Sequence, residues 1–153
     1  MSKAIRIEQT GGPEVMRLVD HDPGAPGPGQ LRIRNHAIGV NYIDVYFRTG
    51  AYPMPLPGGI GMEAAGVVEE VGEGVTGFAP GDRVAYAAGP PGAYAQVHNM
   101  PAKSVVALPE SVDFESAAAL MLKGMTAQYL LRRTYKVGPE TTLLFHAAAG
   151  GVG

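Results

Sequence analysis

The alternation of apolar and polar residues predicts short β-strands over most of the first ~110 positions. In the first of these stretches Ile5 and Ile7 would face inward, and in the third the inward positions include Leu31 and Ile33. Glycines recur between the stretches, which is typical of the bulges and tight corners of a small barrel. The predicted strands cover residues 3–9, 14–20, 30–40, 92–99 and 104–108, with further short strands within 62–86.

Two regions have the pattern of helices. Asn41 is a candidate N-cap, and the apolar residues after it predict a short helix that ends at Gly50. Asp113 is a second candidate cap, for a helix that the Lys123-Gly124 pair would interrupt. A further helix is predicted from about residue 125 to 137, where a Gly-Pro pair stops it.

The stretch at residues 142–153 combines an apolar run with small residues and glycines. This pattern predicts a strand, buried on both faces, that enters the phosphate-binding turn of a dinucleotide fold. Gly150 and Gly153 fit two of the three glycines of that turn, and Ala148 stands at the position of the first. A buried strand ending in a flexible glycine loop would give the same pattern, so these residues alone leave both interpretations open.

Composition narrows the functional classes. The 12 Lys and Arg residues nearly balance the 14 Asp and Glu residues and form no basic stripe, which argues against nucleic acid as a partner. No apolar run is long enough to cross a membrane and the N-terminus lacks the pattern of a signal peptide, so we expect a cytoplasmic protein without a membrane partner. The absence of cysteine excludes disulfides and thiolate-ligated zinc.

Five short motifs follow one another along the chain: GVNYID (39–44), GMEAAGVV (61–68), GDRV (81–84), LKGMTA (122–127) and AAAGGVG (147–153). Together they resemble the medium-chain dehydrogenase/reductase superfamily, specifically the NADPH:quinone oxidoreductases of the zeta-crystallin type. The resemblance covers essentially the whole chain and implies a mainly β fold. Residues 1–122 would form a GroES-like β-barrel catalytic domain. Residues 123–153 would form the first helix and strand of a Rossmann α/β domain that binds NADP, truncated at residue 153.

The same resemblance implies transfer of reducing equivalents from NADPH to a quinone without zinc. Zinc alcohol dehydrogenases of the superfamily carry a cysteine at the position of Asn41 and a histidine at that of Met62, so no metal ligand is expected here. Glu63 would then be structural and buried with a partner, because an unpaired buried carboxylate is costly. Family members tend to form homodimers through the cofactor domain, and the oligomeric state of this chain alone is left open.

Three residues are implied to act on the substrate. The Asn41 amide and the Tyr46 hydroxyl would hydrogen-bond the quinone carbonyl, and Tyr52 in a proline-rich loop would cover the ring. From the residues alone, Asn41 fits equally well as a helix cap and Tyr46 as a half-buried core aromatic.

A second set is implied to bind NADPH. Lys123 would serve a phosphate or ribose, although a solvated lysine at a helix break is the alternative, and Thr126 could simply cap a helix. In the family the cofactor lies between the two domains, so half of its contacts would come from beyond residue 153. The implied cofactor-binding residues are Tyr42, Ile43, Asp44, Val45, Tyr46, Lys123, Thr126, Tyr129, Gly150, Gly151, Val152 and Gly153.

The sequence leaves two other functions open. One is an enone or enoyl-thioester reductase of the same superfamily, and the other is a non-catalytic binding or scaffold module. Because the pyrophosphate-binding helix and the ribose-recognition residue are not among these 153 residues, we expect the chain by itself to bind NADPH weakly and to be catalytically inactive.

Overall fold

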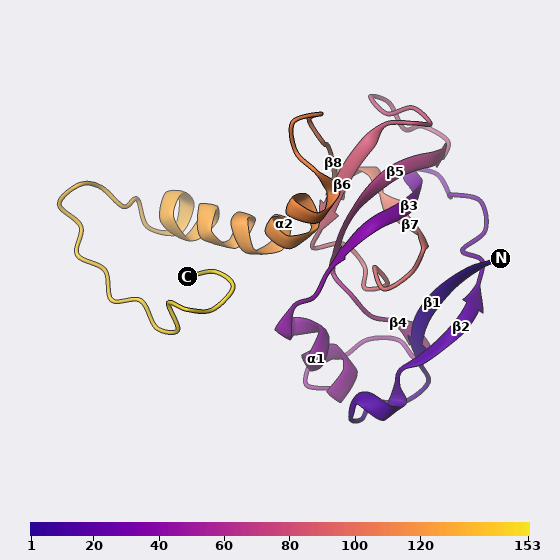
Figure 1. Ribbon diagram of the computed structural model, residues 1–153, viewed down its shortest axis with the longest axis horizontal. Helices are drawn as coiled ribbons and strands as arrows, with labels where there is room; N and C mark the ends of the chain where they lie inside the picture. Colours follow the sequence, from indigo (N-terminus) through magenta and orange to yellow (C-terminus); the bar gives the residue numbers. More distant parts are fainter.

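The computed structural model describes all residues, 1–153. A β-rich body holds the first two thirds of the chain, and one long helix projects from it (Figure 1). A small sheet has the strand order β2-β1-β4, and a larger one has the order β7-β3-β5-β6-β8, with every pair antiparallel. The strands are β1 (Ser2–Ile7), β2 (Arg17–His21), β3 (Gln30–Gly39), β4 (Gly58–Gly59), β5 (Glu63–Val71), β6 (Arg83–Ala87), β7 (Val97–Pro101) and β8 (Val105–Ala107). The predicted mainly β body is confirmed, and its first two strands pair with each other in antiparallel orientation.

The core lies on one face of the larger sheet, where alternate residues of its strands point inward. Leu31 and Ile33 on β3 are completely buried, as the alternation predicted. Register shifts interrupt the β3–β5 pairing at two places, in agreement with the bulges predicted for the barrel. The hydrophobic core on this face contains Leu31, Ile33, Ala64, Val68, Val84, Tyr86, Ala93, Met100 and Val105.

The prediction of a strand at 92–99 was wrong in its first half, because β7 begins only at Val97. The preceding residues bond to the loop before β5: the Tyr94 N–H donates to the Ile60 carbonyl at 2.9 Å. Gly92 has a φ of +145°, a conformation that side chains rarely adopt. The second strand, predicted from residue 14, starts only at Arg17 because a short 3₁₀ turn occupies Pro13–Val15.

Helix α1 (Tyr42–Thr49) connects the end of β3 to the proline-rich loop. It begins after Asn41 and ends at Gly50, whose φ of +82° suits a glycine C-cap. Both ends were predicted. The Asn41 N–H donates to the Asp44 carboxylate at 3.0 Å, which satisfies a donor that the start of the helix leaves free.

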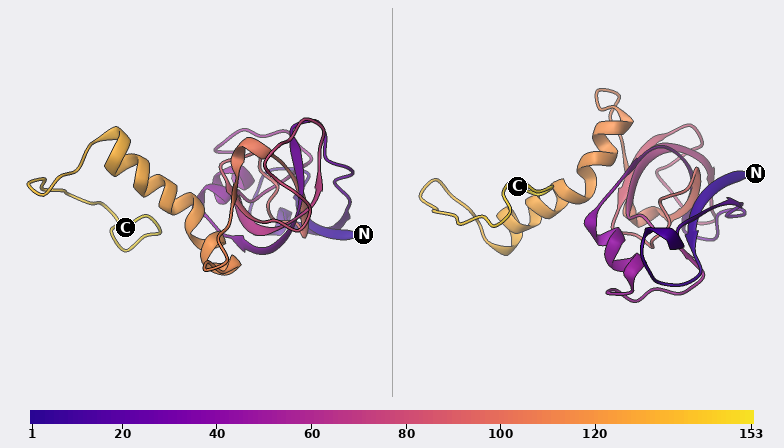
Figure 2. Two further views of the ribbon diagram at one scale, coloured as in Figure 1. Left: turned by 90° about the horizontal axis from the view of Figure 1, so that it is seen from above. Right: turned by 60° about the horizontal axis from the view of Figure 1, so that its bottom comes forward.

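Helix α2 (Phe114–Tyr129) is continuous, so the predicted interruption at Lys123-Gly124 was wrong. Glycine in a helix interior costs about 1 kcal/mol relative to alanine, which weakens a helix without ending it. The cap at Asp113 is confirmed, since its carboxylate accepts the Ser116 N–H at 2.6 Å. Ala117 and Ala118 pack against Ala65 and Ala85 of the sheet, and the rest of α2 runs away from the barrel (Figure 2).

Beyond α2 the chain forms a single π-helical turn at Leu130–Thr134 and then no regular element. The helix predicted to reach residue 137 therefore ends earlier, and the strand predicted at 142–146 was wrong. A strand needs a hydrogen-bonded neighbour, and no other segment pairs with these residues. Leu144, expected inside a sheet, is 86% exposed. No helix of the protein is long and apolar enough to cross a membrane.

Candidate functional site

Polar side chains near the start of α1 are hydrogen-bonded to one buried carboxylate. Glu63, the first residue of β5, is 0% exposed and accepts three hydrogen bonds. Its Oε1 accepts from the Asn41 side-chain amide at 2.7 Å and from the Lys123 ammonium at 3.1 Å, while its Oε2 accepts from the Leu122 N–H at 2.6 Å. We call Asn41, Glu63 and Lys123 the polar cluster. Glu63 is thus buried with partners, as predicted.

A glycine on the neighbouring strand makes room for this geometry. Gly39 is paired with Glu63 across β3 and β5, and a Cβ on Gly39 would collide with the Glu63 carboxylate and the Ala118 carbonyl. The missing side chain therefore leaves the space in which α2 and the carboxylate meet. Lys123 lies in the interior of α2 and reaches back to Glu63, so the interpretation of a lysine at a helix break was wrong.

Three tyrosines form an aromatic group on the exposed side of α1 and the following loop. The rings of Tyr42 and Tyr46 are 5.2 Å apart, and those of Tyr46 and Tyr52 are also 5.2 Å apart. Their exposed fractions are 72%, 39% and 45%, respectively. Tyr46 is therefore more exposed than the alternative of a half-buried core aromatic implies, and the three rings offer aromatic faces to a planar ligand. Tyr46 of α1 and Tyr52 of the following loop thus lie together, and Asn41 is the N-cap residue of the helix that carries Tyr46.

Asp44 faces the interior instead of the solvent. It is 4% exposed, and its Oδ2 accepts hydrogen bonds from the Asn41 N–H and, at 2.8 Å, from the Tyr94 hydroxyl. Burial raises the pKa of Asp44, although these two hydrogen bonds oppose the shift. Burial and the adjacent carboxylate raise the pKa of Tyr94 as well. Asp44 is thus placed to hold α1 on the barrel, while Ile43 and Val45 are half-buried beside it.

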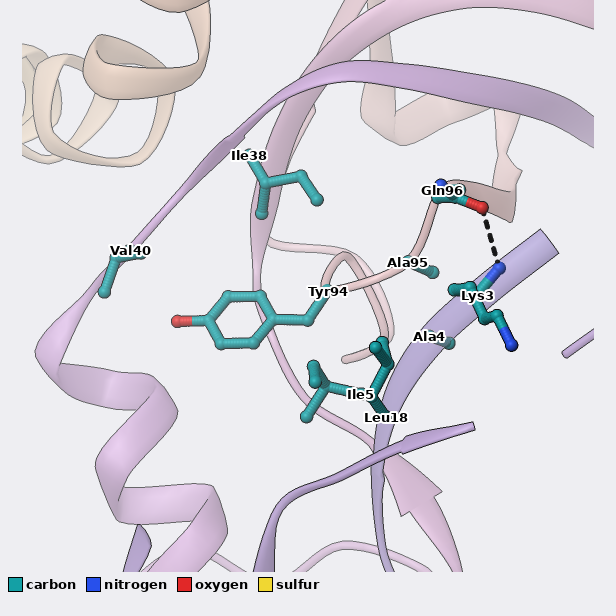
Figure 3. A pocket seen from close by; sticks show the side chains of 9 residues that line it. All are labelled: Lys3, Ala4, Ile5, Leu18, Ile38, Val40, Tyr94, Ala95 and Gln96. Atoms are coloured by element: carbon teal, nitrogen blue, oxygen red, sulfur yellow. Dashed lines mark hydrogen bonds between the residues drawn. The ribbon is translucent and has the colours of Figure 1, made fainter. Parts of the chain in front are cut away.

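Sequence reasoning did not identify Tyr94 as a partner of Asp44, because 50 residues separate the two and no local pattern links them. Figure 3 shows the Tyr94 ring on the wall of a cavity of about 410 Å³. Seven of its nine lining residues are hydrophobic, among them Ile5, Leu18, Ile38 and Val40. The cavity explains why Ile5, expected inside, is only half-buried.

The remaining predicted cofactor residues lie on α2 and in the tail. The Thr126 hydroxyl donates to the Leu122 carbonyl within the helix at 2.7 Å, so the alternative interpretation of Thr126 as a helix cap was wrong. Tyr129 is 48% exposed on the projecting part of α2.

The glycine-rich turn at 147–153 folds back toward α2 (Figure 1). A Cβ on Gly151 would lie 2.9 Å from Cε of Lys123, so the turn rests on the lysine stem. Gly150 and Gly153 donate to backbone carbonyls within the turn, whereas Gly151 and Val152 donate to no backbone group. Gly151 and Val152 thus have free backbone donors beside the Lys123 stem, an arrangement that suits an anion such as phosphate.

No group of three or more His, Asp or Glu side chains is arranged to hold a metal ion. The two superfamily zinc positions are occupied by Asn41, which bonds Glu63, and by Met62, which is buried. Amide and thioether groups are poor ligands for zinc.

The chain is similar to known proteins along its whole length. The model of the alcohol dehydrogenase GroES-like domain family matches residues 27–110. A quinone oxidoreductase of Pseudomonas aeruginosa is 56% identical over 154 residues, which cover 100% of this chain and 47% of that protein. A 2-haloacrylate reductase of a Burkholderia species is 49% identical over 160 residues, with coverage of 100% and 48%.

A solved structure agrees in shape as well as in sequence. The crystal structure of Escherichia coli quinone oxidoreductase complexed with NADPH matches with a TM-score of 0.95 at 50% identity, covering 98% of this chain and 46% of that chain. The predicted GroES-like fold and the resemblance to quinone oxidoreductases are confirmed. The chain spans about half the length of the curated relatives it matches.

Proposed function

Because this chain belongs to the family of alcohol dehydrogenase GroES-like domains, we propose that it supplies the substrate side, and part of the cofactor side, of an NADPH-dependent reductase of quinones that uses no metal. The observation that supports the proposal is the position of Lys123. This lysine contacts the carboxylate that holds Asn41 and, through its stem, the glycine-rich turn. Residues implied for substrate and for cofactor are therefore connected through one side chain.

NADPH, when bound, supplies a hydride that can reduce an electron-poor quinone ring without a Lewis acid. One hydrogen of the Asn41 amide is used by Glu63, and the other remains to donate to a quinone oxygen. The Tyr46 hydroxyl offers a second donor, and both would favour the negative charge that develops on that oxygen. The ring of Tyr52 would cover the quinone and exclude water.

The cofactor would be held by the outer face of α1 and by the tail. We assign the exposed Tyr42, together with Tyr46, to the nicotinamide side, and Gly150–Gly153 with Lys123 to a phosphate or ribose. Tyr129 stays in the proposed set because its ring is exposed on α2. Ile43, Asp44 and Val45 would act mainly through their backbone, because their side chains are buried or half-buried.

The proposed domain division places a catalytic domain at 1–122 and the start of an NADP-binding domain at 123–153. Helix α2 runs across this boundary without a break, so it would connect the two rigidly. For the longer protein we further propose a homodimer and a cytoplasmic location, both on the resemblance described above.

The test is a chimera in which residues 1–153 are joined to the second half of the Pseudomonas aeruginosa relative. We expect it to oxidise NADPH when p-benzoquinone is added, followed by the loss of NADPH absorbance, and to keep this activity in EDTA. No turnover with a quinone would overturn the reductase proposal, and activity abolished by EDTA would overturn its metal-free form. The 153-residue chain alone serves as the control and is expected to show no turnover and only weak NADPH binding.

A second candidate substrate class is an alkene conjugated to a carbonyl group. The observation in its favour is the 49% identity to a 2-haloacrylate reductase. Hydride addition to such an alkene needs the same donor to the carbonyl oxygen, so the polar cluster fits both reactions. Comparing kcat/KM of the chimera for p-benzoquinone and for 2-chloroacrylate decides between them.

A further inference from the structure

Glu63 is more than a buried partner in an ion pair. We propose that it is a positioning residue, which fixes the Asn41 amide and the Lys123 ammonium relative to each other. The inference rests on the proposed reductase function, and it assigns a role to a carboxylate that contacts neither substrate nor cofactor.

One oxygen atom of Glu63 accepts hydrogen bonds from both donors. The Oε1 of Glu63 lies 2.7 Å from the Asn41 amide nitrogen and 3.1 Å from the Lys123 ammonium nitrogen. The two donors come from positions that are far apart in the sequence, at the start of α1 and inside α2. A shift of this oxygen would therefore move the substrate-side and the cofactor-side donors together.

The Glu63 carboxylate is itself held in place by its surroundings. It is 0% exposed, and its other oxygen is held by the Leu122 N–H at 2.6 Å. Gly39 and Ala118 enclose it closely, since even a Cβ on Gly39 would collide with it. The amide and the ammonium are thus attached to a rigid point of the scaffold, which is what precise orientation of reacting groups requires.

Glu63 also compensates the positive charge of Lys123. The Lys123 side chain is 25% exposed, and without Glu63 its flexible stem could extend into water. Paired with Glu63, its charge is compensated and its stem lies under Gly151. Glu63 would thereby also set where the glycine-rich turn rests.

The kinetic test uses the chimera described above, whose unsubstituted turnover separately tests the proposed function. Glu63→Gln keeps the shape but removes the charge and presents an amide N–H₂ to donors, so we expect kcat with p-benzoquinone to fall by about 100-fold. The matched control is Glu69→Gln on the same strand. Glu69 also forms salt bridges, to Arg32 and Arg34, at a side-chain exposure of 26%, and its replacement is expected to leave kcat unchanged.

A double variant separates positioning from mere stability. Glu63→Gln with Lys123→Met removes both charges, so the thermal midpoint should recover relative to Glu63→Gln. Because Lys123 is itself assigned to the cofactor, kcat of the double variant is compared with that of Lys123→Met alone, and it should be lower because the Asn41 amide has also lost its fixed acceptor. A recovered midpoint with a kcat equal to that of Lys123→Met would show that Glu63 is only structural and would overturn the inference.

A readout on the 153-residue chain does not depend on turnover. In NMR spectra, Glu63→Gln should shift the Asn41 side-chain amide signals and remove the protected ammonium signal of Lys123, whereas Glu69→Gln should leave both in place. If the Asn41 amide signals are unchanged by Glu63→Gln, the inference is wrong even when the chimera reduces quinones. If the chimera is inactive and these signals move as expected, the reductase proposal fails while the coupling of the two donors stands.

Discussion

Replacing Lys123 by methionine in the 153-residue chain should destabilise the fold, because Glu63 would keep a buried negative charge without its cation. The nitrogen and Oε1 are 3.1 Å apart. At an effective dielectric constant of about 20 this distance corresponds to an attraction of about 5 kcal/mol. Methionine also removes the cost of partly desolvating the ammonium, so we expect a net loss of about 3 kcal/mol, at the lower end of the values for breaking a buried pair.

The measurement is urea unfolding followed by far-ultraviolet circular dichroism, with the thermal midpoint as a second observable. A loss of about 3 kcal/mol should lower the thermal midpoint by about 6–12 °C for a chain of this size. The matched control is Lys3→Met. Lys3 pairs with Asp20 at a shorter distance, 2.7 Å, but the two side chains are 48% and 56% exposed.

Exposed ion pairs contribute little to stability, so Lys3→Met should leave both transitions unchanged. Equal effects of the two substitutions would refute the reasoning, since burial and not distance is the property claimed to decide the outcome. An unaffected Lys123→Met variant would show that the Asn41 and Leu122 donors suffice to hold the carboxylate.

Three further predictions concern other parts of the fold. Gly39→Ala should lower the free energy of unfolding by at least about 1–3 kcal/mol in urea, because the new Cβ would collide with the Ala118 carbonyl. Asp113→Ala should lower the thermal midpoint, because it removes the cap of α2. Hydrogen bonds from Ser116 lower the pKa of Asp113, so the difference in thermal midpoint between this variant and the parent should vanish as the pH falls below 3.8. A difference in thermal midpoint that persists in acid would contradict this. Burial lowers the pKa of His98 from 6.5 to about 4, so unfolding takes up a proton between these two pH values. The free energy of unfolding should therefore fall by about 1.4 kcal/mol per pH unit as the pH drops through this range. His98→Gln should abolish that pH dependence, and an unchanged pH profile in this variant would exclude His98 as its source.

The elements that could be predicted from sequence are those whose cause is local. The alternation of residues 30–40 gave β3, and Asn41, Gly50 and Asp113 marked helix ends correctly because capping depends on neighbours within one turn. The break at Lys123-Gly124 was predicted wrongly because a glycine lowers helix propensity by only about 1 kcal/mol, a deficit that the surrounding helical residues outweigh.

In the candidate site, too, the features with a local cause could be predicted and those that depend on distant residues could not. Asn41, Tyr46 and Tyr52 could be named as candidates from the motifs, and the side chains of Tyr46 and Tyr52 do lie together. The bonds from Asn41 and Lys123 to Glu63 could not be predicted, because they join residues 22 and 60 positions apart. The inward orientation of Asp44 was hidden for the same reason, since its partner Tyr94 lies in a different part of the barrel.

By itself, the sequence determined the strand pattern, the helix ends, the absence of cysteine and the motif order from which the family was inferred, because each depends on residue type and short spacing. Only the tertiary structure decided which donors share the Glu63 oxygen, that Asp44 faces inward, and where Lys123 meets the glycine-rich turn. It also decided that residues 142–146 form no strand, because a strand exists only where a second segment completes its hydrogen bonds. Such contacts are properties of the packed chain, and no local pattern of residues encodes them.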